Sequence, residues 1–145
     1  MSGEGGIQPE PTRQRLPDTR PSTTHKVKIH DKAMGTVTVY ITAGMYADGK
    51  PGEVFVGIGK SGTTLNAMIS SFAIMVSMSL QYGVPLEAII RRFAATRFEP
   101  MGATSNPEIP LCVSIVDYLV RWLAQTFGHT DVLQELEVRG TPNGE

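Results

Sequence analysis

Residues 24–59 read THKVKIHDKAMGTVTVYITAGMYADGKPGEVFVGIG, and they decide the fold of this chain. Apolar and polar side chains alternate there in three segments, which are 25–30, 36–42 and 53–58. Such alternation is typical of strands with one buried face. Asp48-Gly49 and Pro51-Gly52 mark a reversal between the second and third segments. The stretch therefore predicts an antiparallel meander of three strands with a single apolar face.

Helices are expected to follow these strands, because apolar side chains then recur at helical spacing. They are predicted from Ser61 or Thr63 to about Tyr82, from Pro85 onward, and from Asn106-Pro107 to Gly128. The sequence thus predicts an α+β fold in which a three-stranded antiparallel sheet packs in two layers against about three helices.

The polar faces of two helices carry further expectations. The polar stripe of the first is narrow and consists of Asn66, Ser70, Ser77 and Gln81. A helix with so little polar surface is expected to be nearly surrounded by protein. The third helix is expected to turn Ser114, Asp117, Arg121 and Gln125 outward, with Asp117 and Arg121 spaced to pair at i, i+4.

Composition divides the chain into three parts. Residues 1–24 are rich in Gly, Pro and Arg and predict a flexible basic arm with too little apolar surface to pack. Residues 25–128 predict the folded domain. Residues 129–145 predict a partly disordered C-terminal extension, in which one short helix would dock through Val132, Leu133 and Leu136.

Charge and cysteine content exclude several functions. The 145 residues carry a net charge of -1, which predicts no steering of nucleic acid by the chain as a whole. The basic residues near the N-terminus lack the interleaved aromatic residues of single-strand binders, so nucleic acid is not an expected partner. They are Arg13, Arg15, Arg20, Lys26 and Lys28. The single cysteine, Cys112, is expected to be packed in the core.

The run between Lys60 and Glu87 has no charged residue. An uncharged run above about 18 residues raises the question of a membrane span. Its many Ser, Thr, Asn and Gln side chains instead favour a buried helix of a soluble protein. No signal pattern precedes the domain, so a cytoplasmic protein is expected.

The run Gly57-Ile58-Gly59-Lys60-Ser61-Gly62 fits a glycine-rich dinucleotide pattern, but its strand belongs to a meander and no acidic residue lies about 20 positions on. Val54 also stands where a phosphate loop needs glycine. A milder hypothesis is a phosphate site at the start of the helix. It would use Lys60, Ser61, Gly62, Thr63 and Thr64. The alternative is that Gly59 and Gly62 only make the turn while Thr63 caps the helix.

A second candidate is the stiff polar loop from Arg97 to Pro107, because preformed loops often carry binding sites. Its candidate ligand or partner residues are Arg97, Glu99, Thr104 and Asn106. The alternative is a connector whose Asn106 caps the next helix. His25, His30 and His129 show no ligand spacing, and no metal site is predicted.

Three stretches together resemble one known domain. They are RLPDTRPSTTHK (15–26), LQYGVPLE (80–87) and TRFEPMGATSNPEIP running into SIVDYLVRWL (96–123). They are similar to the region near the C-terminal end of cobalamin-dependent (class II) ribonucleotide reductases, often called the TSCPD domain. The resemblance covers about residues 13–127.

The resemblance implies an accessory role without catalysis. The family enzyme reduces ribonucleotides with adenosylcobalamin, a cysteine radical and a cysteine pair, in a barrel domain that this chain is too short to contain. A lone Cys112 cannot serve as radical carrier and dithiol together. No cofactor is therefore expected on this chain, although adenosylcobalamin is implied for the full-length enzyme.

Two hypotheses follow. In the first, the chain is a detached accessory domain that acts in trans on a reductase catalytic chain, in deoxyribonucleotide supply for DNA synthesis. In the second, it is a stand-alone nucleotide-binding or regulatory module that uses the helix start. A homo-oligomer is compatible with either hypothesis.

Overall fold

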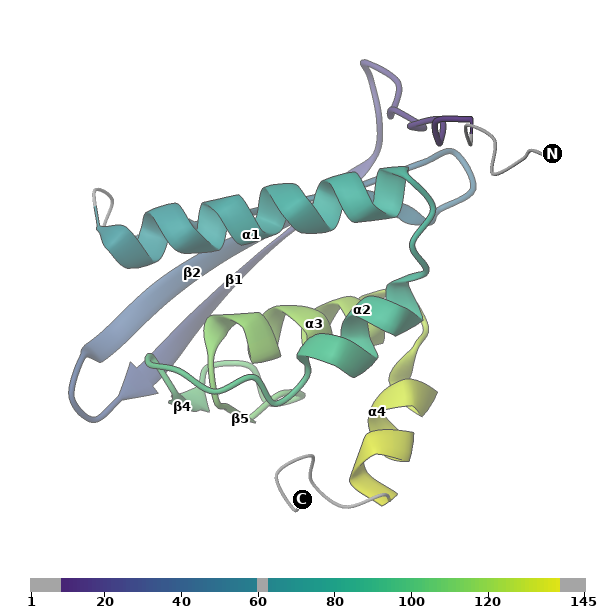
Figure 1. Cartoon of the computed structure of the whole chain (residues 1–145). Coiled ribbons are helices and arrows are strands. Elements are labelled where there is room, and N and C mark those ends of the chain that lie inside the picture. Colours follow the sequence, from purple (N-terminus) through teal and green to yellow (C-terminus); the bar gives the residue numbers. More distant parts are fainter. Residues whose placement is uncertain (1–8, 60–62, 139–145) are drawn as a thin grey trace, which may run out of the picture.

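The computed structural model describes residues 9–59 and 63–138. Within them the sheet has five antiparallel strands in the order β3-β2-β1-β4-β5. The strands are β1 (Ser22–Asp31), β2 (Gly35–Met45), β3 (Pro51–Ile58), β4 (Gly102–Thr104) and β5 (Leu111–Cys112). The helices are α1 (Thr64–Gln81), α2 (Leu86–Phe93), α3 (Ile115–Thr126) and α4 (Thr130–Val138). In Figure 1 α1 crosses in front of β1 and β2, α2 and α3 lie below it, and α4 lies apart from these strands. The predicted α+β class is confirmed.

The meander of β1, β2 and β3 follows the predicted alternation. Val27 pairs with Val39 and Ile29 with Val37, while Ile41 of β2 pairs with Val56 of β3. These inward side chains and the inner faces of the helices form one hydrophobic core. The β1–β2 and β2–β3 connections turn at glycines with positive φ, Gly35 at 79° and Gly49 at 86°.

Two strands more than expected are present. β4 and β5 contain three and two residues, too few to produce an alternating pattern. β4 pairs with β1, where Ile29 lies opposite Thr104 and His30 opposite Ala103. The sheet thus recruits part of the segment for which the sequence predicts only a polar loop. α4 is the short helix of the C-terminal extension, added to the three helices of the domain, and its Val132 and Leu133 are buried as expected.

The third predicted helix begins later than expected. Ser114, and not Asn106, caps α3, because its Oγ accepts a hydrogen bond from Asp117 N at 2.9 Å. Asn106 instead closes a turn in which its Oδ1 accepts from Glu108 N at 3.0 Å. The expectation that Ser114 and Asp117 face outward is wrong, since both are buried. The predicted pair of Asp117 and Arg121 is present, with Arg121 Nε 2.8 Å from Asp117 Oδ1.

The polar stripe of α1 faces the edge of the sheet. β3 is an edge strand, and unpaired edge groups need hydrogen-bond partners. The polar stripe supplies these partners. Asn66 Oδ1 accepts a hydrogen bond from Ile58 N, and Ser77 Oγ bonds to both the N–H and the carbonyl of Val54. Ser70 Oγ donates to Val56 O, and Gln81 Nε2 donates to Gly52 O. Only 22% of the residues of α1 are buried, so the expectation that this helix is nearly surrounded by protein is wrong.

The described part of the N-terminal segment lies against the domain. Gln14 N donates to Gln81 O at 2.9 Å, and the Tyr46 hydroxyl donates to Gln14 O at 2.6 Å. The Arg20 guanidinium pairs with the Glu53 carboxylate. β1 begins at Ser22, inside the stretch for which the composition predicts an arm. Polar contacts fasten residues that have too little apolar surface to be held by burial.

Candidate functional site

The predicted phosphate site at the start of α1 is only partly described. Lys60, Ser61 and Gly62 lie outside the described residues. Thr63 is the N-cap, and its Oγ1 accepts a hydrogen bond from Asn66 N at 3.1 Å. Thr64 is the first residue of the helix. The Thr63 hydroxyl thus caps the helix, as the alternative interpretation predicts. The phosphate site stays a prediction.

Substituting Thr63 tests the capping role. We expect Thr63→Ala to lower the free energy of unfolding by about 1 kcal/mol, because a helix-start amide loses its acceptor. Urea denaturation measures this loss. Ser71→Ala is the matched control, since Ser71 is exposed within α1 and alanine favours a helix. Equal stability of Thr63→Ala and the parent would contradict the capping role.

The structure does not bring the four candidate loop residues into one site. Thr104 Oγ1 donates to Ile109 O at 2.5 Å, and Asn106 Nδ2 donates to the Tyr118 hydroxyl at 2.9 Å. Both side chains therefore stabilise the loop itself. Arg97 and Glu99 are exposed and are the two that stay accessible to a partner.

The same loop is fastened to the end of β1 by a carboxylate. Asp31 Oδ1 accepts from Ala33 N and Met34 N, each at 2.8 Å, and Asp31 Oδ2 accepts from Met101 N at 2.9 Å. These three backbone hydrogen bonds, of which the one from Met101 has the largest effect, lower the pKa of Asp31 below its ordinary value. The carboxylate is ionised at neutral pH and holds the turn after β1 against the chain that leads into β4.

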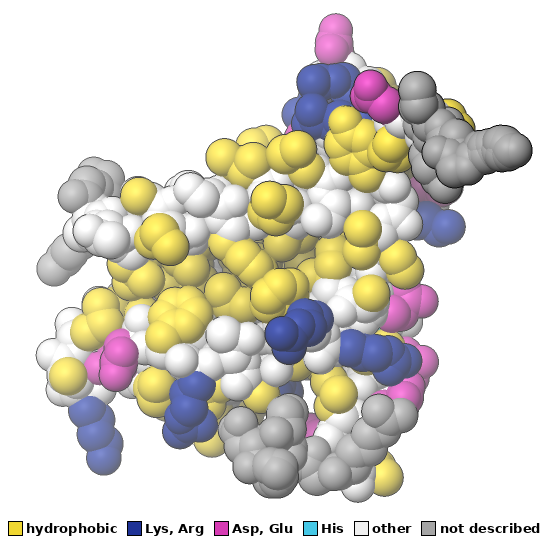
Figure 2. All heavy atoms as spheres, viewed as in Figure 1, with side chains coloured by type: hydrophobic (Ala, Val, Ile, Leu, Met, Phe, Trp, Pro, Cys, Tyr) yellow, Lys and Arg dark blue, Asp and Glu magenta, His cyan; other side chains and the backbone are white. Residues whose placement is uncertain are grey.

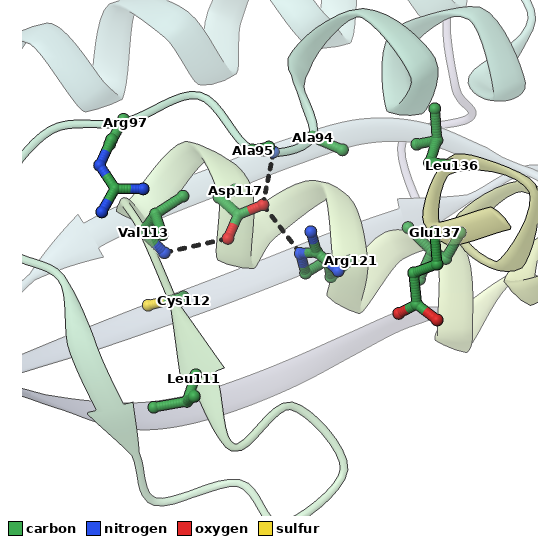
Figure 3. A pocket seen from close by; sticks show the side chains of 11 residues that line it. Ala94, Ala95, Arg97, Leu111, Cys112, Val113, Asp117, Arg121, Leu136 and Glu137 are labelled. Carbon is green, nitrogen blue, oxygen red and sulfur yellow. Dashed lines mark hydrogen bonds and ion pairs between the residues drawn. The ribbon is translucent and has the colours of Figure 1, made fainter. Parts of the chain in front are cut away.

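Arg97 borders a pocket of about 320 Å³ between the loop, α3 and α4 (Figure 3). Cys112, Asp117 and Arg121 also line it. In Figure 3 the Asp117 carboxylate points toward Ala95, Val113 and Arg121. Its acceptor capacity is thereby used inside the fold, and Arg97 is the charged residue of the loop that lines this pocket.

Cys112 is not poised for redox chemistry. Its side chain is buried, and desolvation raises the pKa of its thiol to about 11. The thiol therefore stays protonated at neutral pH, whereas the thiolate is the reactive form. The expected packing role is confirmed. Among the described residues no group of three His, Cys, Asp or Glu side chains could hold a metal ion.

The exposed side of α1 is apolar. We call Met68, Ile74, Met75 and Met78 the α1 face; Met68 is 65% exposed and Met75 is 61% exposed. An apolar groove of about 580 Å³ adjoins it, with Phe72, Phe93 and Phe98 among its lining residues. Figure 2 shows hydrophobic side chains along α1 and in the hollow below it. By length and composition alone, α1 could also cross a membrane, which is weak support for a span.

Sequence reasoning missed this face because it expected α1 to be nearly surrounded by protein. The usable signal is the predicted edge position of β3. An edge strand beside a helix with regularly spaced Asn, Ser and Gln side chains can take those side chains as partners, and the apolar residues of the helix are then left outside.

Comparison with known proteins identifies the family. The sequence profile of the TSCPD domain matches residues 9–127. This chain belongs to the TSCPD domain family. The match covers the whole sheet and α1 to α3, so the α1 face and the Arg97 loop both lie within the TSCPD domain.

The most similar relatives include much longer proteins. The vitamin B12-dependent ribonucleotide reductase of Rhodopirellula baltica is 48% identical over 120 residues, which are 81% of this chain and 11% of the relative. That of Streptantibioticus cattleyicolor is 43% identical over 121 residues, 83% of this chain and 19% of the relative. This chain thus spans a small part of the curated relatives that it matches. No solved structure matches it significantly.

Proposed function

We propose that this TSCPD domain is a detached accessory domain that acts in trans on the catalytic chain of a vitamin B12-dependent ribonucleotide reductase, in deoxyribonucleotide supply. The observation that carries the proposal is the coverage of its relatives, in which the same domain is a small part of a larger reductase chain. The larger chain would supply the reaction, because the one cysteine present here is buried and protonated.

We place adenosylcobalamin on that partner chain. His25 is stacked on Tyr118 and Trp122, and its Nε2 lies 2.7 Å from the Tyr118 hydroxyl. Burial lowers the pKa of His25, so this imidazole is a neutral packing group. The described residues contain no cluster of metal-binding side chains. The His25 ring is committed to packing inside the fold and is not presented as an axial ligand to the cobalt of the cofactor.

The α1 face is the surface that we assign to this docking. Large exposed apolar patches mark interaction sites, and flexible methionine side chains adapt to a partner. The polar side chains of α1 are committed to the edge of β3, which leaves the outer side of the helix apolar. No charged residue occurs in α1, so a partner would desolvate no unpaired charge on this helix.

The test is binding to a purified reductase catalytic chain from the same cells, measured by biolayer interferometry. We expect saturable binding by the parent and at least about tenfold weaker binding by Met75→Glu, because an unpaired carboxylate buried in the interface costs more than about 1.4 kcal/mol. Met75 is exposed, so this substitution should change the free energy of unfolding by only about 0.5 kcal/mol.

Leu111→Glu is the matched control. Leu111 is 67% exposed but lies on β5, at the opposite end of the sheet from β3. The Leu111→Glu variant should bind the reductase chain as the parent does. Absence of binding by the parent would overturn the proposal. Light scattering adds a further outcome: a dimer that dissociates in Met75→Glu, without reductase binding, would assign the α1 face to a second copy of this chain.

A further inference from the structure

The sheet has a second side, which the helices leave open. On β1, β2 and β3 the side chains opposite the core alternate outward, and neither large aromatic residue among them is covered. Tyr40 is 44% exposed and Phe55 is 56% exposed. Tyr40 pairs with Gly57, whose missing side chain leaves open space beside the ring. Phe55 pairs with Thr42 in the next row, so the two rings are diagonal neighbours.

Positive charge lies beside the rings. Lys26 is paired with Tyr40, and its Nζ lies 5.9 Å from the centre of the Tyr40 ring. Lys28 is the next outward residue of β1 and is exposed, and His30 follows it. The outward side chains of β1 thus form a row of cationic or protonatable groups along one border of the aromatic pair.

The negative charges of these strands are neutralised or turned inward. The three strands contain two carboxylates, Asp31 and Glu53. Asp31 is buried and accepts three backbone hydrogen bonds. Glu53 pairs with the Arg20 guanidinium, whose Nη2 donates to Glu53 Oε1 at 3.0 Å. The open face therefore presents two lysines without an unpaired carboxylate from its own strands.

We propose that this open face, built on Lys26, Lys28, Tyr40 and Phe55, binds single-stranded nucleic acid. Exposed rings stack unpaired bases of any sequence, and lysines contact the phosphates between them. Aromatic residues on a sheet surface that stack two or three bases are a known arrangement for such ligands. The occupant is set by charge complementarity: an acidic peptide would satisfy the lysines but would leave both rings without stacking partners.

This inference differs from the expectation that nucleic acid is not a partner. That expectation rested on the absence of aromatic residues between the basic residues along the chain. Here the rings come from β2 and β3, while the lysines come from β1. The interleaving occurs across the sheet and is visible only once the register is known.

The test is fluorescence anisotropy with a labelled 12-nucleotide oligothymidylate and the full chain. We expect saturable binding in low salt, with log K falling against log salt at a slope of about -1.4 if two lysines contact phosphates. Tyr40→Ala and Phe55→Ala should each weaken binding about tenfold, because each removes a stacking platform. Lys26→Ala should weaken binding and reduce the salt slope by about half.

Controls separate this site from general attraction to polyanions. Lys50→Ala removes an exposed lysine from the β2–β3 turn, and Met75→Ala removes an exposed apolar side chain from α1, on the helical side of the sheet; both should bind as the parent does. Urea denaturation verifies that each variant is folded. No binding, binding that the Tyr40 and Phe55 substitutions leave unchanged, or equal binding of duplex DNA or polyglutamate would overturn the proposal. The reductase docking experiment tests the α1 face, whereas this experiment tests the open sheet face. A negative result in one therefore leaves the other proposal standing.

Discussion

Gly102→Ala is expected to lower the free energy of unfolding by about 4 kcal/mol, from backbone strain and overpacking together. Gly102 has a φ of 149°, which side-chain-bearing residues rarely adopt. A Cβ at this position would also lie well inside van der Waals contact of the His30 carbonyl oxygen. That oxygen belongs to the strand on which β4 pairs, so relief would require β4 to separate from β1. Urea denaturation measures the loss.

Gly83→Ala separates the two causes. Gly83 also has a positive φ, 97°, but a Cβ there would meet nothing within 4 Å. Its loss should be about 1 kcal/mol, the cost of the backbone conformation alone. Similar losses for the two variants would mean that β4 does not approach β1 as closely as the structure has it. A small loss for Gly83→Ala beside a large one for Gly102→Ala would support the close approach.

The sequence predicts the parts of the fold that repeat a local pattern. The meander follows from alternation in β1, β2 and β3, and α1 follows from its helical spacing and from the Thr63 cap. The pattern also predicts the i, i+4 pair of Asp117 and Arg121. These features depend on residues close together in the chain, where periodicity and capping rules apply.

The missed features depend on partners that are distant in the chain. β4 is a strand because His30 and Ile29 lie beside it, more than 70 residues earlier in the sequence. Asn106 and Ser114 are both good capping residues, and a tertiary bond from Ser114 Oγ to Thr96 O, at 2.6 Å, favours the second. The two candidate surfaces also depend on partners that are distant in the chain. The α1 face arises because β3 lies at the edge of the sheet, and the open sheet face arises from the residues that are paired across β1, β2 and β3.

Asp117→Ala is expected to lower the free energy of unfolding by about 3 kcal/mol, because it leaves three partly buried donors without an acceptor. Asp117 Oδ1 accepts from Ala95 N at 2.7 Å and from Arg121 Nε at 2.8 Å, and Oδ2 accepts from Val113 N at 3.0 Å. One carboxylate thus joins α3 to the segment after α2 and to the end of β5. Ala95 has a φ of 67°, a strained conformation for alanine that the bond to Asp117 stabilises.

Arg121→Ala distinguishes the backbone bonds of Asp117 from its ion pair. Arg121 is partly exposed, and its removal leaves the carboxylate with both backbone donors, so the expected loss is only about 1 kcal/mol. If the two variants lose equal stability, the ion pair and not the backbone bonds is what Asp117 contributes. In the double variant no guanidinium remains to be left unpaired, so its loss should be smaller than the sum of the single losses by at least about 0.5 kcal/mol. Additive losses would mean that Arg121 contributes the same stability without Asp117, through another partner.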